Sequence, residues 1–328
     1  MRAVICRAWG AVEDLTLEDI PRPTPGPQQV LIDVKATGVN YADSLMVAGR
    51  YQTRPPFPFS PGLETAGVVA HCGHEVTRYK PGDRVMAILA HGGFAEQAVA
   101  DQTETFAIPA GMPFEEAGAF PIAYISSHVA IRWQGRLEAG ETLLVLGAAG
   151  GVGLTAVEIG KALGARVIAG ASTVEKLAVA REHGADALVN YTIENLTERV
   201  TALTDGKGAD VCFDPVGGEL FDAALSSLGW GGRILLVGFV GGIPSIPANR
   251  LLVKHRAALG SSLRYFRWHA PDKLRRSVEE LTQWYAAGKL APCVSYRLPL
   301  ERSVDAIRLL TDRKAHGKVV VMPEFRPH

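Results

Sequence analysis

The sequence predicts an α/β protein in which a doubly wound parallel sheet of six strands is inserted into a domain of short β-strands. Two observations carry this prediction. Between residues 142 and 263, short aliphatic runs alternate with helical stripes, the pattern of parallel strands joined by crossover helices. The first third of the chain instead has short strands at close intervals, separated by proline- and glycine-rich turns, which favours a compact β domain.

Each strand of the predicted parallel sheet is recognised by an apolar run. The first, Leu143 to Leu146, is aliphatic throughout, as expected for a strand buried on both faces. The strands are residues 143–146, 166–169, 187–190, 210–213, 233–237 and 257–260, and helices are expected at 176–182, 195–203 and 220–228.

A glycine-rich turn, GAAGGVG at residues 147–153, follows the first of these strands and leads into a helix that ends near Gly164. Because glycine has no side chain, the backbone of this turn can approach a pyrophosphate closely, and the helix N-terminus directs N–H groups at it. The spacing differs from the usual G-x-G-x-x-G, so a plain strand-to-helix turn is the alternative. The candidate contacts to a dinucleotide are Ala149, Gly150, Gly151 and Val152.

Composition limits the possible partners. With 328 residues and 47% hydrophobic content, the chain suits two domains with full cores. Net charge is zero, so no electrostatic footprint for nucleic acid or an anionic membrane is present. There is no apolar run of membrane-spanning length and no signal peptide, and the four cysteines are isolated, which together favour a reducing cytoplasm.

The chain returns to the β domain at its end. After the sheet, residues 272–288 and 302–311 have helical stripes, and 318–322 is an apolar strand that needs a sheet to join. The N-terminal β domain is the expected host. We therefore expect a discontinuous domain of residues 1–122 and 264–328, interrupted by a nucleotide-binding domain of residues 123–263.

Four motifs make the chain recognisable. GVNYAD at 38–43, PGLETAGVV at 61–69, KPGDRV at 80–85 and AAGGVG at 148–153 have the order and spacing of the medium-chain dehydrogenase/reductases. The chain resembles most closely the quinone oxidoreductase (zeta-crystallin-like) branch, over essentially its whole length. This resemblance implies a GroES-like catalytic domain, an inserted Rossmann domain and a cleft between them.

The same resemblance bears on metal binding. Asn40 and Leu63 stand where zinc-dependent relatives have ligands, and the lobe carrying the structural-zinc cysteines is absent. Neither asparagine nor leucine replaces thiolate or imidazole in a tetrahedral zinc site. The rival cluster HCGH, at residues 71–74, has no second ligand pair, and adjacent strand residues face opposite ways. We expect a zinc-independent enzyme.

NADPH is the expected cofactor. An NAD-specific fold places a carboxylate at the end of the second strand, but this chain has Ala171, Ser172 and Thr173 there. Ser172 and Glu175 are in the register of a helix-capping pair, and Lys176 lies in the first helical turn, where a 2′-phosphate would stabilise it. Relatives use Ser, Lys and Tyr here, which assigns Ser172, Lys176 and Tyr191 to NADPH. A solvated lysine and a packed tyrosine are the alternative.

Residues from both domains are expected around the reacting atoms. Asn40, Asp43 and Tyr51 are the catalytic candidates, with Asn40 and Tyr51 as hydrogen-bond donors to the acceptor oxygen. A turn residue and a half-buried aromatic are the alternative roles. Leu45 replaces a second tyrosine of related enzymes, which makes the acceptor uncertain. The remaining cofactor candidates are Ser126, Gly238, Phe239, Val240, Ser261, Ser262 and Leu263.

The expected activity is transfer of hydride from NADPH to a quinone or another α,β-unsaturated carbonyl. An enoyl-thioester reductase is one alternative, with Lys254, Arg256, Arg264 and Arg267 as the local candidates to hold coenzyme A phosphates. An NADPH-binding protein with little turnover is another. A homodimer paired through the edge strand at 257–260 is expected, and the alternative is a monomer whose edge is shielded by residues 264–269.

Overall fold

The computed structural model describes residues 1–325, which form two compact units. Unit 1 comprises Met1–Ile122 and the chain from Pro292 onward, and unit 2 comprises Ala123–Ala291. The sequence placed the second boundary near 264, but α9 (Leu263–His269) and α10 (Pro271–Ala286) belong to unit 2. One contact that holds α10 to unit 2 is the hydrogen bond that Trp133 Nε1 donates to Ser277 Oγ at 2.9 Å.

Unit 2 contains the predicted parallel sheet of six strands, in the order β10-β9-β8-β11-β12-β13. This is the strand order of a Rossmann fold, and every neighbouring pair is parallel. The strands are β8 (Thr142–Leu146), β9 (Arg166–Ala171), β10 (Ala187–Asn190), β11 (Ala209–Asp214), β12 (Leu228–Leu236) and β13 (Ala257–Gly260).

Helices cover the two faces of this sheet. The chain moves outward from β8 to β10 and then returns past β8 to β11, so right-handed crossovers place the helices before this reversal on one face and those after it on the other. Leu144, Ile168 and Cys212 pack with α6 and α7, and Gly160 of α4 lies against Leu143 on the other face. The helices are α4 (Gly151–Ala162), α5 (Val174–Glu182), α6 (Leu196–Leu203), α7 (Leu220–Ser226) and α8 (Ala248–Leu252), preceded by α3 (Pro121–His128) and a π-helix, Val129–Gln134.

Unit 1 is built on a mixed sheet in the order β14-β15-β3-β4-β5-β7, with β6 also paired to β3. The last strand, β15 (Lys318–Met322), pairs antiparallel with β3 (Gln29–Val39), so the prediction that it joins the N-terminal β domain is confirmed. The others are β4 (Glu64–Cys72), β5 (Arg84–Ile88), β6 (Gln97–Asp101), β7 (Thr105–Ala107) and β14 (Val294–Pro299), beside the hairpin of β1 (Arg2–Ile5) and β2 (Thr16–Asp19).

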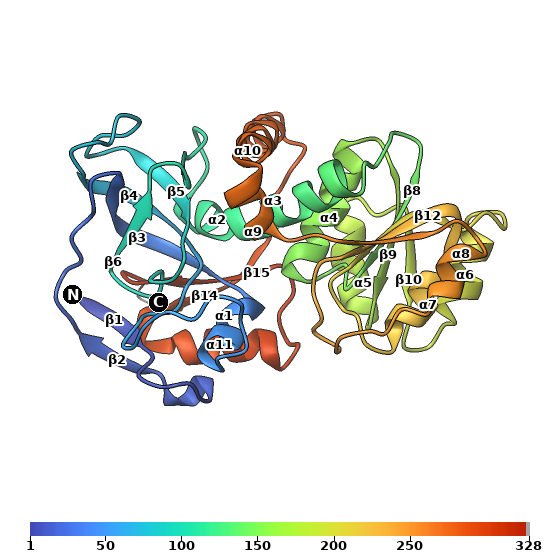
Figure 1. Ribbon diagram of the computed structural model, residues 1–328, viewed down its shortest axis with the longest axis horizontal. Coiled ribbons are helices and arrows are strands. Elements are labelled where there is room, and N and C mark those ends of the chain that lie inside the picture. Colours follow the sequence, from blue (N-terminus) through green and yellow to red (C-terminus); the bar gives the residue numbers. More distant parts are fainter. Residues whose placement is uncertain (326–328) are drawn as a thin grey trace. The chain divides into compact units, whose positions relative to one another are not determined.

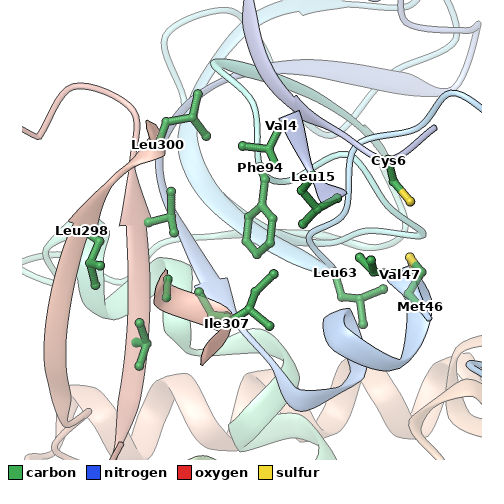
Figure 2. Close-up of a cluster of buried hydrophobic side chains, with 14 of the residues drawn as sticks. Val4, Cys6, Leu15, Met46, Val47, Leu63, Phe94, Leu298, Leu300 and Ile307 are labelled. Atoms are coloured by element: carbon green, nitrogen blue, oxygen red, sulfur yellow. The ribbon is translucent and has the colours of Figure 1, made fainter. Parts of the chain in front are cut away.

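The core of unit 1 joins both ends of the chain. Figure 2 shows Phe94 among Val4, Leu15 and Ile307, all buried. The helix α11 (Ser303–Thr311) supplies Ile307 and lies beside α1 (Tyr41–Val47), although these helices are far apart in sequence (Figure 1). The remaining helix of unit 1 is α2 (Phe114–Ala119). Within residues 1–325, no helix is long and apolar enough to cross a membrane.

Candidate functional site

The glycine-rich turn of unit 2 joins β8 to α4 at the carboxyl edge of the sheet, where the strand order reverses. Gly147 has a φ of 57°, and a Cβ at Gly153 would lie 2.1 Å from the carbonyl oxygen of Gly147. The N-cap of α4 is Gly150, and no side chain caps this end of the helix. The first N–H groups of α4 are therefore presented by backbone alone, as an anion-binding turn requires.

One serine ties this turn to the preceding helix, and it is not the predicted one. Ser127 Oγ of α3 donates to the carbonyl oxygen of Val152 at 2.8 Å and lies 2.8 Å from Thr155 Oγ1. Ser127 is fully buried, whereas the predicted Ser126 is half-buried. The two are adjacent, and the sequence offered no signal to decide which of them faces the glycine turn.

The three predicted NADPH-selecting residues lie at the carboxyl ends of neighbouring strands. Lys176 Nζ is 3.5 Å from Ser172 Oγ, which directly follows β9. Tyr191 directly follows β10, and its ring lies 3.4 Å from the position a Cβ would take at Gly170. An amine, a hydroxyl and a phenol are thus held at one corner of the sheet edge.

The alternative role considered for Ser172, as the N-cap of α5, is wrong. The N-cap of α5 is Thr173, whose Oγ1 accepts a hydrogen bond from the Lys176 amide at 3.3 Å. Only Thr173 combines an extended backbone, with φ −143° and ψ 161°, with a side chain three residues before that amide. The Ser172 hydroxyl is consequently not used for capping. The nearby Glu175 carboxylate interacts with its own backbone N–H and with Thr173, which lower its pKa.

The loops after the last three strands complete this edge, and Asp214 shapes them. Asp214 ends β11 and is buried, and its Oδ1 accepts from the N–H groups of Val216 and Gly217 at 2.8 and 2.9 Å. The carbonyl of Val216 then accepts from Gly241 at 2.7 Å, which holds the loop containing Gly238, Phe239 and Val240. Burial raises the pKa of Asp214 despite those two hydrogen bonds. The sequence analysis did not single out Asp214.

The remaining predicted cofactor residues lie at the same edge. Ser261 follows β13 and its amide donates to Leu236 O at 3.0 Å. Ser262 is the N-cap of α9 and Leu263 is its first residue. The segment 264–269, which the alternative of a monomer treated as a loop shielding the sheet edge, lies entirely within helix α9 (Leu263–His269).

In unit 1, Asn40 is the N-cap of α1 and is only 9% exposed. Its Nδ2 donates to Glu64 Oε1 at 2.8 Å and to Gly38 O at 3.3 Å. Its Oδ1 accepts from Lys318 Nζ at 2.7 Å. Asn40 therefore belongs to an internal polar network, and of its two N–H groups only the one directed at Gly38 makes a long bond.

Lys318 and Glu64 form the centre of this network. Lys318 Nζ donates to Glu64 Oε1 at 2.8 Å and to the carbonyl of Val39 at 3.1 Å, in addition to Asn40. The Glu64 side chain is fully buried, and its Oε2 accepts from the amide of Ile122 at 2.7 Å. We call Asn40, Glu64 and Lys318 the polar triad. The sequence analysis quoted Glu64 only within a motif and missed Lys318.

The sequence analysis expected Asp43 among the residues around the reacting atoms, but the structure does not place it on an accessible surface. It is fully buried in the first turn of α1, and its Oδ2 accepts from the Asn40 amide at 2.7 Å. Burial raises the pKa of Asp43 to about 7, against the lowering effects of the Asn40 N–H and the Lys318 charge. Its position in the structure supports a role in holding Asn40 rather than in contacting a substrate.

Tyr51 is half-buried and packs against the main core of unit 1. It follows α1 after Gly49, which has a positive φ of 66° and no Cβ, and a Cβ there would lie 2.9 Å from the ring of Trp9. Trp9 also packs edge-on against Phe57, with ring centroids 4.4 Å apart. Trp9 and Phe57 are both partly exposed, and the sequence analysis did not identify this aromatic pair near the end of α1.

Among residues 1–325, no group of three His, Cys, Asp or Glu side chains is placed to hold a metal ion. The rival cluster at 71–74 is spread out, because Cys72 Sγ donates to Tyr79 O while His74 lies 3.8 Å from Glu75 and is 79% exposed. Leu63 is buried in the core shown in Figure 2.

Comparisons with known proteins identify the family to which this architecture belongs. A model described as an alcohol dehydrogenase GroES-like domain matches residues 26–110, and one described as a zinc-binding dehydrogenase matches residues 151–283. The chain is 40% identical over 325 residues to a quinone oxidoreductase-like protein 2 homolog from Nematostella vectensis, covering 98% of this chain and 88% of that protein.

Solved structures agree. A probable oxidoreductase from Mycobacterium abscessus is 36% identical, with a TM-score of 0.90 over 98% of this chain and 99% of that one. The Escherichia coli quinone oxidoreductase, solved with NADPH, is 27% identical, with a TM-score of 0.92 over 98% and 100% of the two chains.

A Rossmann unit inserted into a GroES-like unit defines the class of the protein as a dinucleotide-dependent dehydrogenase or reductase. With relatives of this identity and coverage, the chain belongs to the quinone oxidoreductase branch of the medium-chain dehydrogenase/reductase superfamily, and it is an oxidoreductase.

Proposed function

We propose that this oxidoreductase uses NADPH to reduce a quinone or another α,β-unsaturated carbonyl, without a catalytic metal. The observation that carries the proposal is the meeting of the Lys176 amine and the Ser172 hydroxyl, 3.5 Å apart, at the end of β9. This is where an NAD-specific fold places a carboxylate for the ribose. A cation and donors suit a 2′-phosphate instead, and the related Escherichia coli enzyme was solved with NADPH.

The glycine turn would hold the pyrophosphate through the backbone of Ala149, Gly150, Gly151 and Val152, at the N-terminus of α4. When bound, NADPH supplies a hydride from C4 of its nicotinamide ring. The acceptor oxygen then gains negative charge, and a hydrogen-bond donor directed at that oxygen lowers the barrier. We assign that role to the long-bonded Nδ2–H of Asn40 and to the Tyr51 hydroxyl.

Zinc independence rests on the chemistry of the side chains. Asn40 and Leu63 stand where zinc-dependent relatives have ligands, and Leu63 is buried in an apolar core. Activity should survive exhaustive chelation, and elemental analysis should find no stoichiometric zinc. One zinc per chain together with loss of activity on chelation would contradict this part of the proposal.

The decisive experiment follows NADPH oxidation with a panel of quinones, enones and enoyl thioesters. We expect turnover with quinones or enones, and slower turnover with NADH. Of the four candidates to hold coenzyme A phosphates, Arg256 is committed internally, because it donates to the backbone carbonyls of Leu228, Gly229 and Ser226, which weakens the case for thioester reduction. Faster turnover with an acyl-CoA than with any quinone would favour the thioester reductase, and cofactor binding without turnover would favour the NADPH-binding protein.

We also propose a homodimer paired through β13. This strand is at the edge of the sheet of unit 2, and its residues Ala257, Ala258 and Leu259 are only half-buried in the isolated chain. An uncharged edge presents unpaired backbone groups that a second copy can satisfy across a two-fold axis. Leu259→Pro should shift the sedimentation of the protein towards the monomer. A wild-type protein that is monomeric at micromolar concentration would exclude the dimer.

A cytoplasmic location is our remaining proposal. Cys6, Cys72, Cys212 and Cys293 are all free thiols, and a disulfide-free chain suits a reducing compartment. Fractionation of cells producing the native protein would test this proposal, and recovery in an oxidising compartment would contradict it.

A further inference from the structure

The polar triad of unit 1 contains a buried cation with all its donors used. A lysine ammonium has three N–H donors, and the structure provides three acceptors, at 2.7 Å (Asn40 Oδ1), 2.8 Å (Glu64 Oε1) and 3.1 Å (Val39 O). The Lys318 side chain is only 8% exposed. A buried charge costs free energy unless it is paired and hydrogen-bonded, so this arrangement needs an explanation.

The triad removes the usual ambiguity about how an asparagine side chain is turned. Oδ1 of Asn40 faces an ammonium, which has no lone pair to offer, and Nδ2 faces a carboxylate, which has no hydrogen to offer. Turning the amide by 180° would set donor against donor and acceptor against acceptor. Lys318 and Glu64 together therefore permit only one orientation of Asn40.

Lys318 also changes the chemistry of the amide. A positive charge 2.7 Å from Oδ1 draws electron density from Nδ2 through amide resonance. The Nδ2–H groups become more positive and donate more strongly, which is how linked hydrogen bonds strengthen one another. One of these groups is held by Glu64, and the other, directed at Gly38 O at 3.3 Å, is the one that an acceptor oxygen can take over.

We propose that Lys318 is a positioning residue for the reduction, orienting and polarising the Asn40 amide so that one Nδ2–H is directed at the acceptor oxygen. Lys318 itself touches neither substrate nor cofactor. This inference rests on the proposed role of Asn40 as a donor. It predicts that Lys318 contributes to turnover only through Asn40 and contributes nothing to NADPH binding.

The test uses two variants that contain Lys318→Met. The single variant leaves the Glu64 carboxylate buried without its cation, which destabilises the fold. The second variant is therefore the charge-balanced pair Lys318→Met/Glu64→Gln. The control is Lys35→Met, which removes a lysine of β3 paired with Glu324, a carboxylate 73% exposed. Each is measured for kcat and KM with a quinone, for the dissociation constant of NADPH, and for Tm.

We expect the charge-balanced pair to lower kcat about tenfold, as misplacement of a reacting group does, with the NADPH dissociation constant changed less than about twofold. Asn40→Ala alone should lower kcat about 100-fold, as loss of one oxyanion donor does. Combined with Asn40→Ala, the pair should add less than about a twofold further loss. An additive loss, or an unchanged kcat in the pair, would overturn the proposal.

A second readout does not depend on turnover. The side-chain ¹⁵N–¹H pair of Asn40, assigned by its disappearance in Asn40→Ala, should shift further in the charge-balanced pair than in Glu64→Gln alone, because Glu64 is itself bonded to Nδ2, and it should stay in place in Lys35→Met. If the wild type reduces no quinone or enone, the proposed function fails. A further shift of the Asn40 signals on adding Lys318→Met to Glu64→Gln would even then support positioning by Lys318, and identical signals in these two variants would refute it.

Discussion

The two units build their candidate sites from different materials. Unit 2 uses backbone from a short stretch of chain, with glycines at 147, 150, 151 and 153. Unit 1 uses buried side chains from remote segments, because Lys318 and Asn40 are 278 residues apart. A site made of backbone is insensitive to many side-chain substitutions, but an added Cβ at its closest contacts disrupts it. A site made of buried charged side chains is disrupted when one member of an ion pair is removed.

This difference also divides what each unit can bind. The glycine turn presents N–H groups at a helix N-terminus and suits phosphate of any origin. The polar triad presents one oriented amide and no negative charge outward, so it suits a neutral oxygen that becomes negative during reaction. Cofactor binding and acceptor activation should therefore be separable by mutation.

The largest expected effect is on the stability of unit 1. Lys318→Met alone leaves the buried Glu64 carboxylate without its cation, and breaking such a buried pair lowers the free energy of unfolding by about 3–5 kcal/mol. The charge-balanced pair Lys318→Met/Glu64→Gln should recover most of that loss. Differential scanning calorimetry would measure both against Lys35→Met, whose surface pair should contribute less than about 1 kcal/mol. Equal losses in the single variant and the pair would show that charge balance does not govern this site.

The next effect is a pH dependence from Asp43, whose pKa in the folded protein is raised by burial to about 7 from an ordinary 3.8. The carboxyl faces Lys318 of β15, Glu64 of β4 and the amide of Asn40. Between those pKa values the folded state keeps a proton that the unfolded state has lost, so stability falls as pH rises through this window and levels off above it.

From pH 5 to pH 8 this Asp43 contribution amounts to about 3 kcal/mol. Asp43→Asn keeps an acceptor for the Asn40 amide and removes the titration. The measurement is the free energy of unfolding of the wild type and of the variant at both pH values. Subtracting the variant from the wild type at each pH cancels the contribution of the histidines, which both proteins share. A difference that stays constant between pH 5 and pH 8 would mean that Asp43 titrates normally.

The sequence predicted the parallel sheet and the glycine turn of unit 2 but missed the centre of the polar triad of unit 1, and distance along the chain explains both outcomes. Most strands of the parallel sheet contain a short apolar run and the glycine turn is contiguous, so neighbouring residues are enough to predict them. Lys318 begins an apolar strand near the chain end, and only the pairing of β15 with β3 places its side chain beside Asn40. Nothing local marks a lysine that will be buried by partners so far away.

The one-residue error at α5 has a different cause. Ser172 and Thr173 are equally good capping residues, and the choice depends on backbone angles that propensities do not resolve. The predicted second boundary between the units was wrong for a similar reason. The apolar stripe of helix α10 indicates that the helix packs against another element, but it does not identify that element. Its partners, among them Trp133, become known only from the fold.

A smaller effect is expected on cofactor choice in unit 2. Lys176→Ala removes one charge-assisted phosphate contact, which costs about 1.5–3 kcal/mol. The KM for NADPH should therefore rise by one to two orders of magnitude at most, with that for NADH nearly unchanged. Lys161→Ala is the control, since Lys161 of α4 pairs with Asp186 at 2.8 Å. Equal losses for both cofactors would remove the assignment of Lys176 to the 2′-phosphate.

The smallest effects form a graded pair in the glycine turn. A Cβ at Gly153 would meet the Gly147 carbonyl oxygen at 2.1 Å, a contact that only a backbone shift relieves, whereas at Gly150 it would lie 3.3 Å away. Overpacking of this kind costs about 1–3 kcal/mol, so Gly153→Ala should lower Tm and weaken both NADPH and NADH. Gly150→Ala should change both measurements less.

The control for this pair is Gly26→Ala in unit 1, because a Cβ there would meet only the end of the flexible Gln29 side chain, 3.1 Å from Oε1, and the backbone does not need a positive φ. It should leave both dissociation constants unchanged and lower Tm less than Gly153→Ala does. Both cofactors must weaken together in Gly153→Ala, because the turn contacts the pyrophosphate that they share, in contrast to Lys176→Ala. Equal weakening of cofactor binding by Gly153→Ala and Gly150→Ala would contradict binding of the pyrophosphate by the backbone of this turn. A different effect on NADPH than on NADH in either variant would contradict it as well.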